Sequence, residues 1–102
     1  MNFELLKNNI LGVISNYPVS KAAIFGSFAR GDSTDHSDVD LLIETNKPVT
    51  LFQILQLEIE ISEITRRKTD IVEYAAIKDS IRERVLSEAI QILWAKETTV
   101  FT

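Results

Sequence analysis

The stretch GSFARGDSTDHSDVDLLIE, residues 26–44, is the part of the sequence that says most about the fold. It follows the apolar run KAAIF (residues 21–25) and ends in a second apolar run, VDLLIE (residues 39–44). Short apolar runs bounded by Gly and turn-forming residues are typical of buried strands. The stretch therefore predicts two core strands joined by a polar segment that is rich in Asp.

The regions on either side of this stretch carry helical patterns and one further strand pattern. Apolar residues recur at helical spacing, and TDIVEY resembles the two core strands. The sequence predicts helices over residues 3–17, 50–67 and 79–95 and a third strand over residues 69–74. This alternation predicts an α/β (α+β) fold, in which a small mixed sheet of three or four strands is flanked by helices.

Two of these helices have a capping-box pattern at their start. Thr50 is followed three residues later by Gln53, and Ser80 is followed by Glu83. The pattern predicts that the second helix begins at Thr50 and that the third begins near Ser80.

Length and composition limit the class of protein. A chain of 102 residues is the size of one domain, so residues 1–102 are expected to form a single domain; the tail over residues 97–102 has no clear assignment. The absence of Cys excludes disulfides and thiolate metal sites, and His36 alone cannot build a zinc site. No signal peptide or apolar run of about 20 residues is present, so we expect a soluble, cytoplasmic protein without a membrane span.

The charge balance disfavours direct binding of long nucleic acid. The formal net charge is −4, whereas nucleic-acid affinity comes largely from basic side chains that neutralise phosphates. The one basic cluster is Arg66, Arg67 and Lys68. We expect it at a helix C-terminus, where cations complement the helix dipole.

The Gly-Ser pair at positions 26 and 27 is a candidate phosphate site. Gly allows a tight turn and close approach of a ligand to the backbone. If Ser27 to Arg30 opens a short helix, its free N–H groups face any ligand above the strand end. An ordinary strand-to-loop turn is the alternative.

Three Asp residues are candidate metal ligands. Asp38 and Asp40 are two positions apart at a strand entrance, so they share a face with Cβ atoms about 7 Å apart. Asp70 begins the third predicted strand and lies beside them if the second and third strands are neighbours. Hard carboxylate oxygens suit Mg²⁺ or Mn²⁺. A solvent-facing strand edge remains open as an alternative for each of the three.

The other two Asp residues of the stretch indicate turn formation. Asp32 and Asp35 lie among Gly, Ser and Thr, where Asp stabilises turns. An EF-hand is excluded because Gly and Glu are missing at its sixth and twelfth positions. A Walker A loop is excluded because no Gly-Lys-Ser/Thr follows Gly26.

Taken together, GSFARGDSTDHSDVDLLIE resembles the Gly-Ser…Asp-x-Asp signature of the polymerase-β-like nucleotidyltransferase superfamily, in the compact form of the minimal nucleotidyltransferases. The resemblance covers residues 21–74 most clearly. It implies that Gly26 and Ser27 hold a nucleotide triphosphate, with Arg30 orienting the phosphates or the helix turn. It also implies that Asp38, Asp40 and Asp70 form the acidic metal-binding and catalytic trio. Many members carry a basic residue where Phe28 stands.

The resemblance also implies a function and a partner. Minimal nucleotidyltransferases are commonly antitoxins, paired with an all-helical HEPN ribonuclease toxin. The expected reaction is Mg²⁺-dependent transfer of AMP from ATP to a toxin hydroxyl, with tyrosine as the expected acceptor. We expect a hetero-oligomer with the toxin, and the excess apolar residues of helix 50–67 and of the last helix are a candidate contact surface.

Two alternatives remain open from the sequence. A non-catalytic antitoxin or adaptor would block its partner by binding alone. A small-molecule nucleotidyltransferase would modify a free hydroxyl, although the chain has no room for an acceptor domain.

Overall fold

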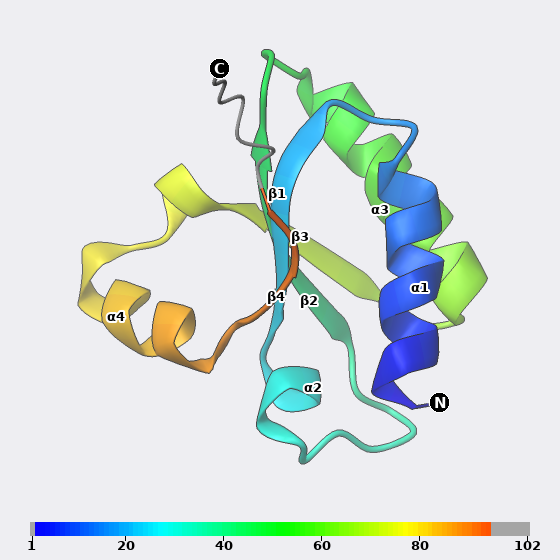
Figure 1. Ribbon diagram of the computed structural model, residues 1–102, viewed down its shortest axis with the longest axis vertical. Helices are drawn as coiled ribbons and strands as arrows, with labels where there is room; N and C mark the ends of the chain where they lie inside the picture. The colour runs from blue at the N-terminus through cyan, green and yellow to red at the C-terminus, as the bar shows by residue number, and fades with distance from the viewer. Residues whose placement is uncertain (1, 95–102) are drawn as a thin grey trace, which may run out of the picture.

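A four-stranded mixed sheet forms the centre of the molecule (Figure 1). The computed structural model describes residues 2–94, with strands in the spatial order β3-β2-β1-β4. Strand β1 is antiparallel to β2 and β4, and β2 is parallel to β3. The strands are β1 (Val19–Phe25), β2 (Val39–Thr45), β3 (Thr69–Glu73) and β4 (Ile90–Leu93). The prediction of a small mixed sheet is confirmed.

The helices cover the two faces of this sheet unequally. Helices α1 (Phe3–Ile14) and α3 (Leu51–Thr65) lie on one face, and α4 (Asp79–Glu88) lies on the other (Figure 1). The short helix α2 (Ser27–Arg30) lies at one end of the sheet, and the 3₁₀ turn η1 (Tyr74–Ala76) follows β3. The molecule therefore has one thickly covered face and one thinly covered face.

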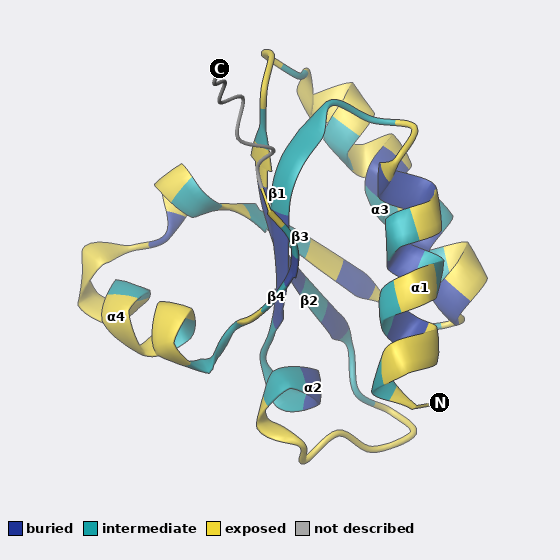
Figure 2. Cartoon of the chain, in the orientation of Figure 1, coloured by how far each residue is buried: buried dark blue, intermediate teal, exposed yellow. Residues whose placement is uncertain are grey.

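Alternation along β2 divides its side chains between these faces. Val39, Leu41 and Ile43 belong to the large core cluster with α1 and α3, whereas Leu42 belongs to a smaller cluster with Ala23 and Ile77. Successive strand residues point to opposite faces, so Asp40 shares the face of Leu42. Burial is concentrated where the sheet meets α1 and α3 (Figure 2).

Helix α3 begins and ends with recognisable caps. The Thr50 hydroxyl accepts a hydrogen bond from the Gln53 backbone N–H at 3.1 Å, and the Gln53 side chain accepts one from the Thr50 N–H at 2.8 Å. The predicted capping box at Thr50 is thus confirmed. Arg66 ends the helix in the left-handed conformation, with φ of 58°, which reverses the chain toward β3.

Helix α1 ends earlier than its apolar pattern indicates. The prediction extended it to Tyr17, but it ends at Ile14, and residues 15–18 form a turn that includes Pro18. The Tyr17 hydroxyl donates a 2.7 Å hydrogen bond to Glu60 of α3. Burial and this neighbouring carboxylate raise the pKa of Tyr17 to about 12. Tyr17 therefore joins the end of α1 to α3.

The prediction of a helix over residues 79–95 was wrong beyond Glu88. Helix α4 ends there, Ala89 is extended, and Ile90–Leu93 form β4 against β1. The apolar residues Ile92 and Leu93 fit a helical period, but pairing with the open edge of β1 buries Ile92 and satisfies the backbone. That edge belongs to a distant segment, so local periodicity does not reveal it.

The predicted second capping box was also wrong. Helix α4 starts at Asp79 with Lys78 as its N-cap, and no side-chain hydrogen bond caps it. Ser80 and Glu83 therefore lie inside the helix. The tail over residues 97–102 is outside the described residues. Among the helices of residues 2–94, none is long and apolar enough to span a lipid bilayer.

Candidate active site

The site begins at Gly26, where β1 turns into α2. Gly26 has φ of 75° and ψ of −150°, a conformation that side-chain-bearing residues rarely adopt. A Cβ at this position would overlap the Oδ2 atom of Asp40. Glycine is required here both by the backbone and by the closeness of the carboxylate, so the Gly-Ser turn lies directly against Asp40.

Strand pairing brings two of the predicted acidic residues together. In the β2–β3 ladder Asp40 is in register with Asp70, and in the β1–β2 ladder it is in register with Phe25, which immediately precedes Gly26. Both Asp residues lie near the starts of their strands. Because β2 and β3 are parallel neighbours, these two strand starts lie at the same end of the sheet. The sequence predicted Asp70 beside Asp40 if the second and third predicted strands are neighbours, and β2 and β3 are neighbours.

The electrostatics of Asp40 reflect two neighbouring carboxylates, Asp70 and Asp38. Burial raises the pKa of Asp40, and the charges of Asp70 and then Asp38 raise it further. Arg30 acts in the opposite direction and lowers it. A group of negative charges around a half-buried carboxylate is unfavourable by itself and becomes favourable when a cation neutralises it.

A basic residue that the sequence assigned only to a helix end holds the loop before Asp38. The guanidinium of Arg67 donates to the backbone carbonyls of Thr34 and Ser37, at 3.0 and 3.1 Å. It also lies over the ring of Phe28, 4.9 Å from the ring centre. Arg67 therefore connects α2, the loop that leads to Asp38 and the start of β3.

The role of Arg67 was missed because its partners are 30 or more positions away. The basic cluster does lie at the end of α3, as predicted, but only Arg66 serves as the C-cap. The one signal in the sequence is that position 28 is a bulky aromatic residue, on which an Arg from outside the motif can stack. Phe28 is buried in the large core cluster, so its side chain supplies no basic group at the surface.

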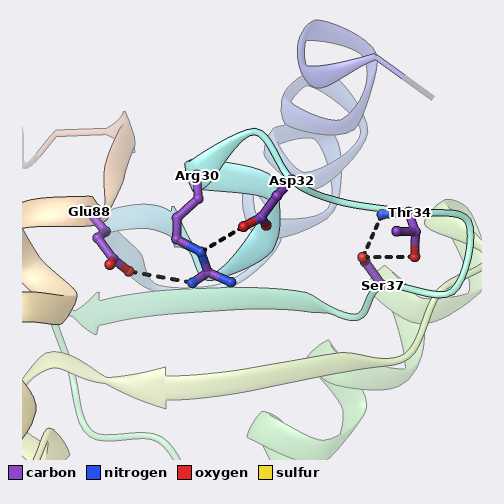
Figure 3. A network of polar contacts seen from close by, with 5 residues as sticks. All are labelled: Arg30, Asp32, Thr34, Ser37 and Glu88. Carbon is purple, nitrogen blue, oxygen red and sulfur yellow. Dashed lines mark hydrogen bonds and ion pairs between the residues drawn. The ribbon is translucent and has the colours of Figure 1, made fainter.

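Arg30 and the first Asp of the loop form a surface network beside the site (Figure 3). The Nε atom of Arg30 is 3.2 Å from Asp32, and its Nη1 atom is 3.5 Å from Glu88 of α4. Arg30 is about half exposed. It thus links α2 to α4 and stays accessible to an anion.

The rest of the loop is held by turn contacts. The Thr34 N–H donates a 2.7 Å hydrogen bond to the Ser37 hydroxyl (Figure 3). Asp32 and Asp35 are exposed, and Asp35 lies in a turn, in agreement with the prediction that these two residues shape the loop.

A cavity of about 490 Å³ opens next to Gly26, between α2 and α4. Its lining includes Phe25, Arg30 and Arg84. This volume is in the range of small-molecule binding sites. A ligand with an anionic group at Gly26 could therefore extend between two guanidinium groups.

The carboxylates fit a cation that is shared with a substrate. Within residues 2–94, no set of three or more His, Cys, Asp or Glu side chains is close enough to enclose a metal ion. Mg²⁺ is commonly bound by one or two carboxylates together with substrate phosphates. The oxygen donors of Asp38, Asp40 and Asp70 suit that mode and do not suit an all-protein cage.

Comparison with known sequences identifies the class of protein. Residues 8–98 match the family model described as polymerase beta, nucleotidyltransferase, and the chain belongs to this family. The chain is 31% identical over 93 residues to MJ0435 of Methanocaldococcus jannaschii, which is named as a protein adenylyltransferase by inference. The match covers 91% of this chain and 100% of that protein. It is 28% identical to the protein adenylyltransferase MntA of Thermococcus cleftensis, over 74% of this chain and 77% of that protein.

Solved structures place the fold among the minimal nucleotidyltransferases. One structure described as a minimal nucleotidyltransferase is 30% identical, with a TM-score of 0.75, and covers 88% of this chain and 95% of that one. A Shewanella oneidensis complex of an MNT antitoxin with its tri-AMPylated HEPN toxin has a TM-score of 0.70. It is 14% identical and covers 92% of this chain and 73% of that one, so it shows the fold alone.

Proposed function

We propose that this protein is an antitoxin that transfers AMP from ATP to a hydroxyl, expected to be a tyrosine, of a HEPN-type partner and thereby neutralises it. The observation that carries the proposal is the position of Asp40, which lies against the Gly26 turn and in register with Asp70. The protein adenylyltransferase names of its relatives and the AMPylated HEPN toxin bound to a fold relative support this choice of substrate and acceptor.

The roles of the site residues follow from their positions. Gly26 and Ser27 would hold the triphosphate at the turn, and Arg30 would balance its charge. Asp38, Asp40 and Asp70 would hold Mg²⁺ or Mn²⁺ jointly with the phosphates. Such a cation supplies Lewis-acid stabilisation of the negative charge on the reacting phosphates.

The reaction needs no covalent intermediate on this chain. The acceptor oxygen forms a bond with the α-phosphorus of ATP, and the bond from that phosphorus to the bridging oxygen of the β-phosphate breaks. Pyrophosphate leaves, and Asp70 is the candidate acceptor for the hydroxyl proton because it is the exposed member of the trio.

The decisive experiment is intact-mass measurement of the neighbouring gene product after incubation with this protein, ATP and Mg²⁺. We expect a gain of one or more AMP units on that product, and Asp38→Ala should abolish it. Asp35→Ala is the matched control, because this Asp lies in the same loop but is exposed. Full transfer by Asp38→Ala would overturn the assignment of the site.

A binding-only antitoxin is the second candidate, favoured by the exposed apolar side chains of α3. It predicts that the partner is still neutralised by the double variant Asp38→Ala/Asp40→Ala and that the mass of the partner never changes with any of the four nucleotides. A small-molecule nucleotidyltransferase would instead consume ATP in the presence of a free hydroxyl acceptor and would leave the partner unmodified.

The proposed setting follows from the substrate. ATP and a ribonuclease partner are both available in the cytoplasm, where we expect the protein to act in a hetero-oligomer with its toxin. We expect neither membrane association nor direct binding of long nucleic acid, since the net charge is −4.

A further inference from the structure

Helix α3 exposes an apolar stripe that the core does not use. The exposed fractions are 75% for Leu51, 74% for Phe52, 47% for Leu55 and 57% for Ile59. At about 100° per residue these four positions fall within an arc of about 100°. We call this stripe the outer face of α3. The buried residues Leu57 and Ile61 lie on a different side of the helix.

The outer face adjoins a groove that reaches Asp70. A cavity of about 400 Å³ lies between the second half of α3 and the start of β3. Its lining includes Ile59 of the outer face and Asp70, together with Ser62, Glu63 and Lys68. Figure 1 shows the end of α3 and the start of β3 at the same edge of the sheet. A segment bound along the outer face would therefore reach Asp70.

The charge of this groove restricts what can occupy it. Glu58, Glu63 and Asp70 supply three carboxylates against the single cation of Lys68. Glu58 also accepts a 3.2 Å hydrogen bond from the Ile71 N–H, which satisfies one backbone donor of β3. A second copy of this chain, with net charge −4 and the same acidic groove, would repel the first. A nucleic acid would be repelled for the same reason.

From these observations we propose that the outer face of α3 and the adjoining groove bind the segment of the partner protein that carries the acceptor hydroxyl. The segment would combine apolar side chains, which cover Leu51, Phe52 and Leu55, with Lys or Arg side chains near Glu63. Its hydroxyl would reach Asp70, which takes the proton while the oxygen bonds to the α-phosphorus. This inference rests on the proposed function, for which it defines the acceptor site.

The test uses an apolar and a charged substitution with matched controls. Leu55→Ser removes part of the outer face, and Glu63→Lys reverses the charge of the groove. Leu86→Ser on α4 and Leu5→Ser on α1 are the controls, since their side chains are 42% and 49% exposed, close to the 47% of Leu55. All four variants should keep the melting temperature of the wild type nearly unchanged, because surface substitutions cost little stability.

Binding of the purified partner is then measured by calorimetry, and AMP transfer is measured by intact mass. We expect Leu55→Ser and Glu63→Lys each to weaken partner binding at least about tenfold and to slow transfer in proportion, as for central interface residues. Binding of a non-hydrolysable ATP analogue should be unchanged in both. The controls should bind and transfer like the wild type.

Two results would overturn the inference. One is equal partner affinity for Leu55→Ser and Leu86→Ser, and the other is an unchanged partner affinity for Glu63→Lys. These results are distinguishable from failure of the proposed function, which would appear as full transfer by Asp38→Ala. A variant that loses the ATP analogue together with the partner would show that the substitution disturbs the nucleotide site, which also contradicts a separate acceptor groove.

Discussion

On one face of the sheet, α1 and α3 bury a continuous apolar cluster in which Leu6, Ile10 and Ile61 are completely inaccessible. On the other face, α4 buries none of its residues from Asp79 to Glu88, and among residues 2–94 the cluster beneath it has three buried members. The same strand, β2, serves both faces. Its odd-numbered residues pack under α1 and α3, and Asp40 lies on the side of α4.

The difference follows from what the site requires. Covering the carboxylates with a second apolar layer would remove them from water and from any phosphate, at a cost of several kcal/mol for each unpaired charge. The α1/α3 face can be fully packed because Asp40 lies on the opposite side of β2. It therefore supports β2 through buried packing, while the other face stays open to a ligand.

The largest expected effect compares isoleucine truncations on the two faces. Ile61→Ala in α3 should cost about 2–5 kcal/mol of unfolding free energy, because the side chain is 0% exposed and leaves a cavity. Ile81→Ala in α4 should cost less than about 1 kcal/mol, because this side chain is 39% exposed. Urea unfolding measures both. Equal losses of unfolding free energy in the two variants would show that the two faces contribute equally to stability.

Next in size is the comparison of two glycines with positive φ. Gly26→Ala should destabilise by about 1–3 kcal/mol and reduce AMP transfer at least tenfold, because it strains the turn and displaces Asp40. Gly31→Ala should cost about 1 kcal/mol with little loss of transfer, since nothing lies within 4 Å of its added Cβ. Similar transfer rates for both variants would contradict a close approach at Gly26.

A smaller effect is expected at Arg67, which holds the loop on the open side of the site. Arg67→Ala should destabilise by about 1–2 kcal/mol through the lost hydrogen bonds to Thr34 and Ser37. Arg67→Lys should keep only part of the stability that Arg67→Ala loses, because an ammonium cannot donate to both carbonyls and stack on Phe28 as a guanidinium does. Hydrogen exchange of amides 31–38 measures the effect, and full rescue by Lys would refute this role.

The smallest expected effect is the folding stability that is lost because the carboxylates of Asp38, Asp40 and Asp70 repel one another. Without a cation, Asp40→Asn should raise stability at pH 7 by at most about 1 kcal/mol, since the site is partly screened by solvent. The pKa of Asp40 is raised above its ordinary value of 3.8. The folding stability that this protonated carboxyl contributes is therefore fully present below pH 3.8 and is lost as the pH rises through the folded-state pKa.

The matching measurement is urea unfolding from pH 4 to pH 7 without divalent cations. The wild type should lose more stability over this range than Asp40→Asn, and the exposed-site control Asp35→Asn should behave like the wild type. A parallel pH dependence in Asp40→Asn would mean that the carboxylate group does not destabilise the sheet.

Local sequence patterns predicted most of the fold for identifiable reasons. The runs KAAIF and VDLLIE are apolar at four of five and four of six positions, and the Thr50–Gln53 capping box is a contact between near neighbours, so both are visible without tertiary information. The predictions failed where a distant segment decided the outcome. Ile92 and Leu93 form a strand because β1 has an open edge, and Ala89 interrupts the helical backbone before them.

The same division applies to the site. The spacing of Asp38 and Asp40 and the Gly-Ser pair before them can be read from the chain, since both depend on residues a few positions apart. The convergence of Asp70 with Asp40 needed the β2–β3 register, and the contact of Arg67 with the loop needed the reversal at Arg66. Neither register nor long-range pairing is encoded in local periodicity.

The sequence by itself thus determined most of the elements up to α4, the glycine turn and the acidic pair, because each arises from short-range backbone and side-chain preferences. Only the tertiary structure decided which face of β2 would be closed, which strand would lie beside Asp40, and that the apolar outer face of α3 would lead to Asp70. Those outcomes depend on how separate segments share one sheet and bury one core, which is a property of the whole chain.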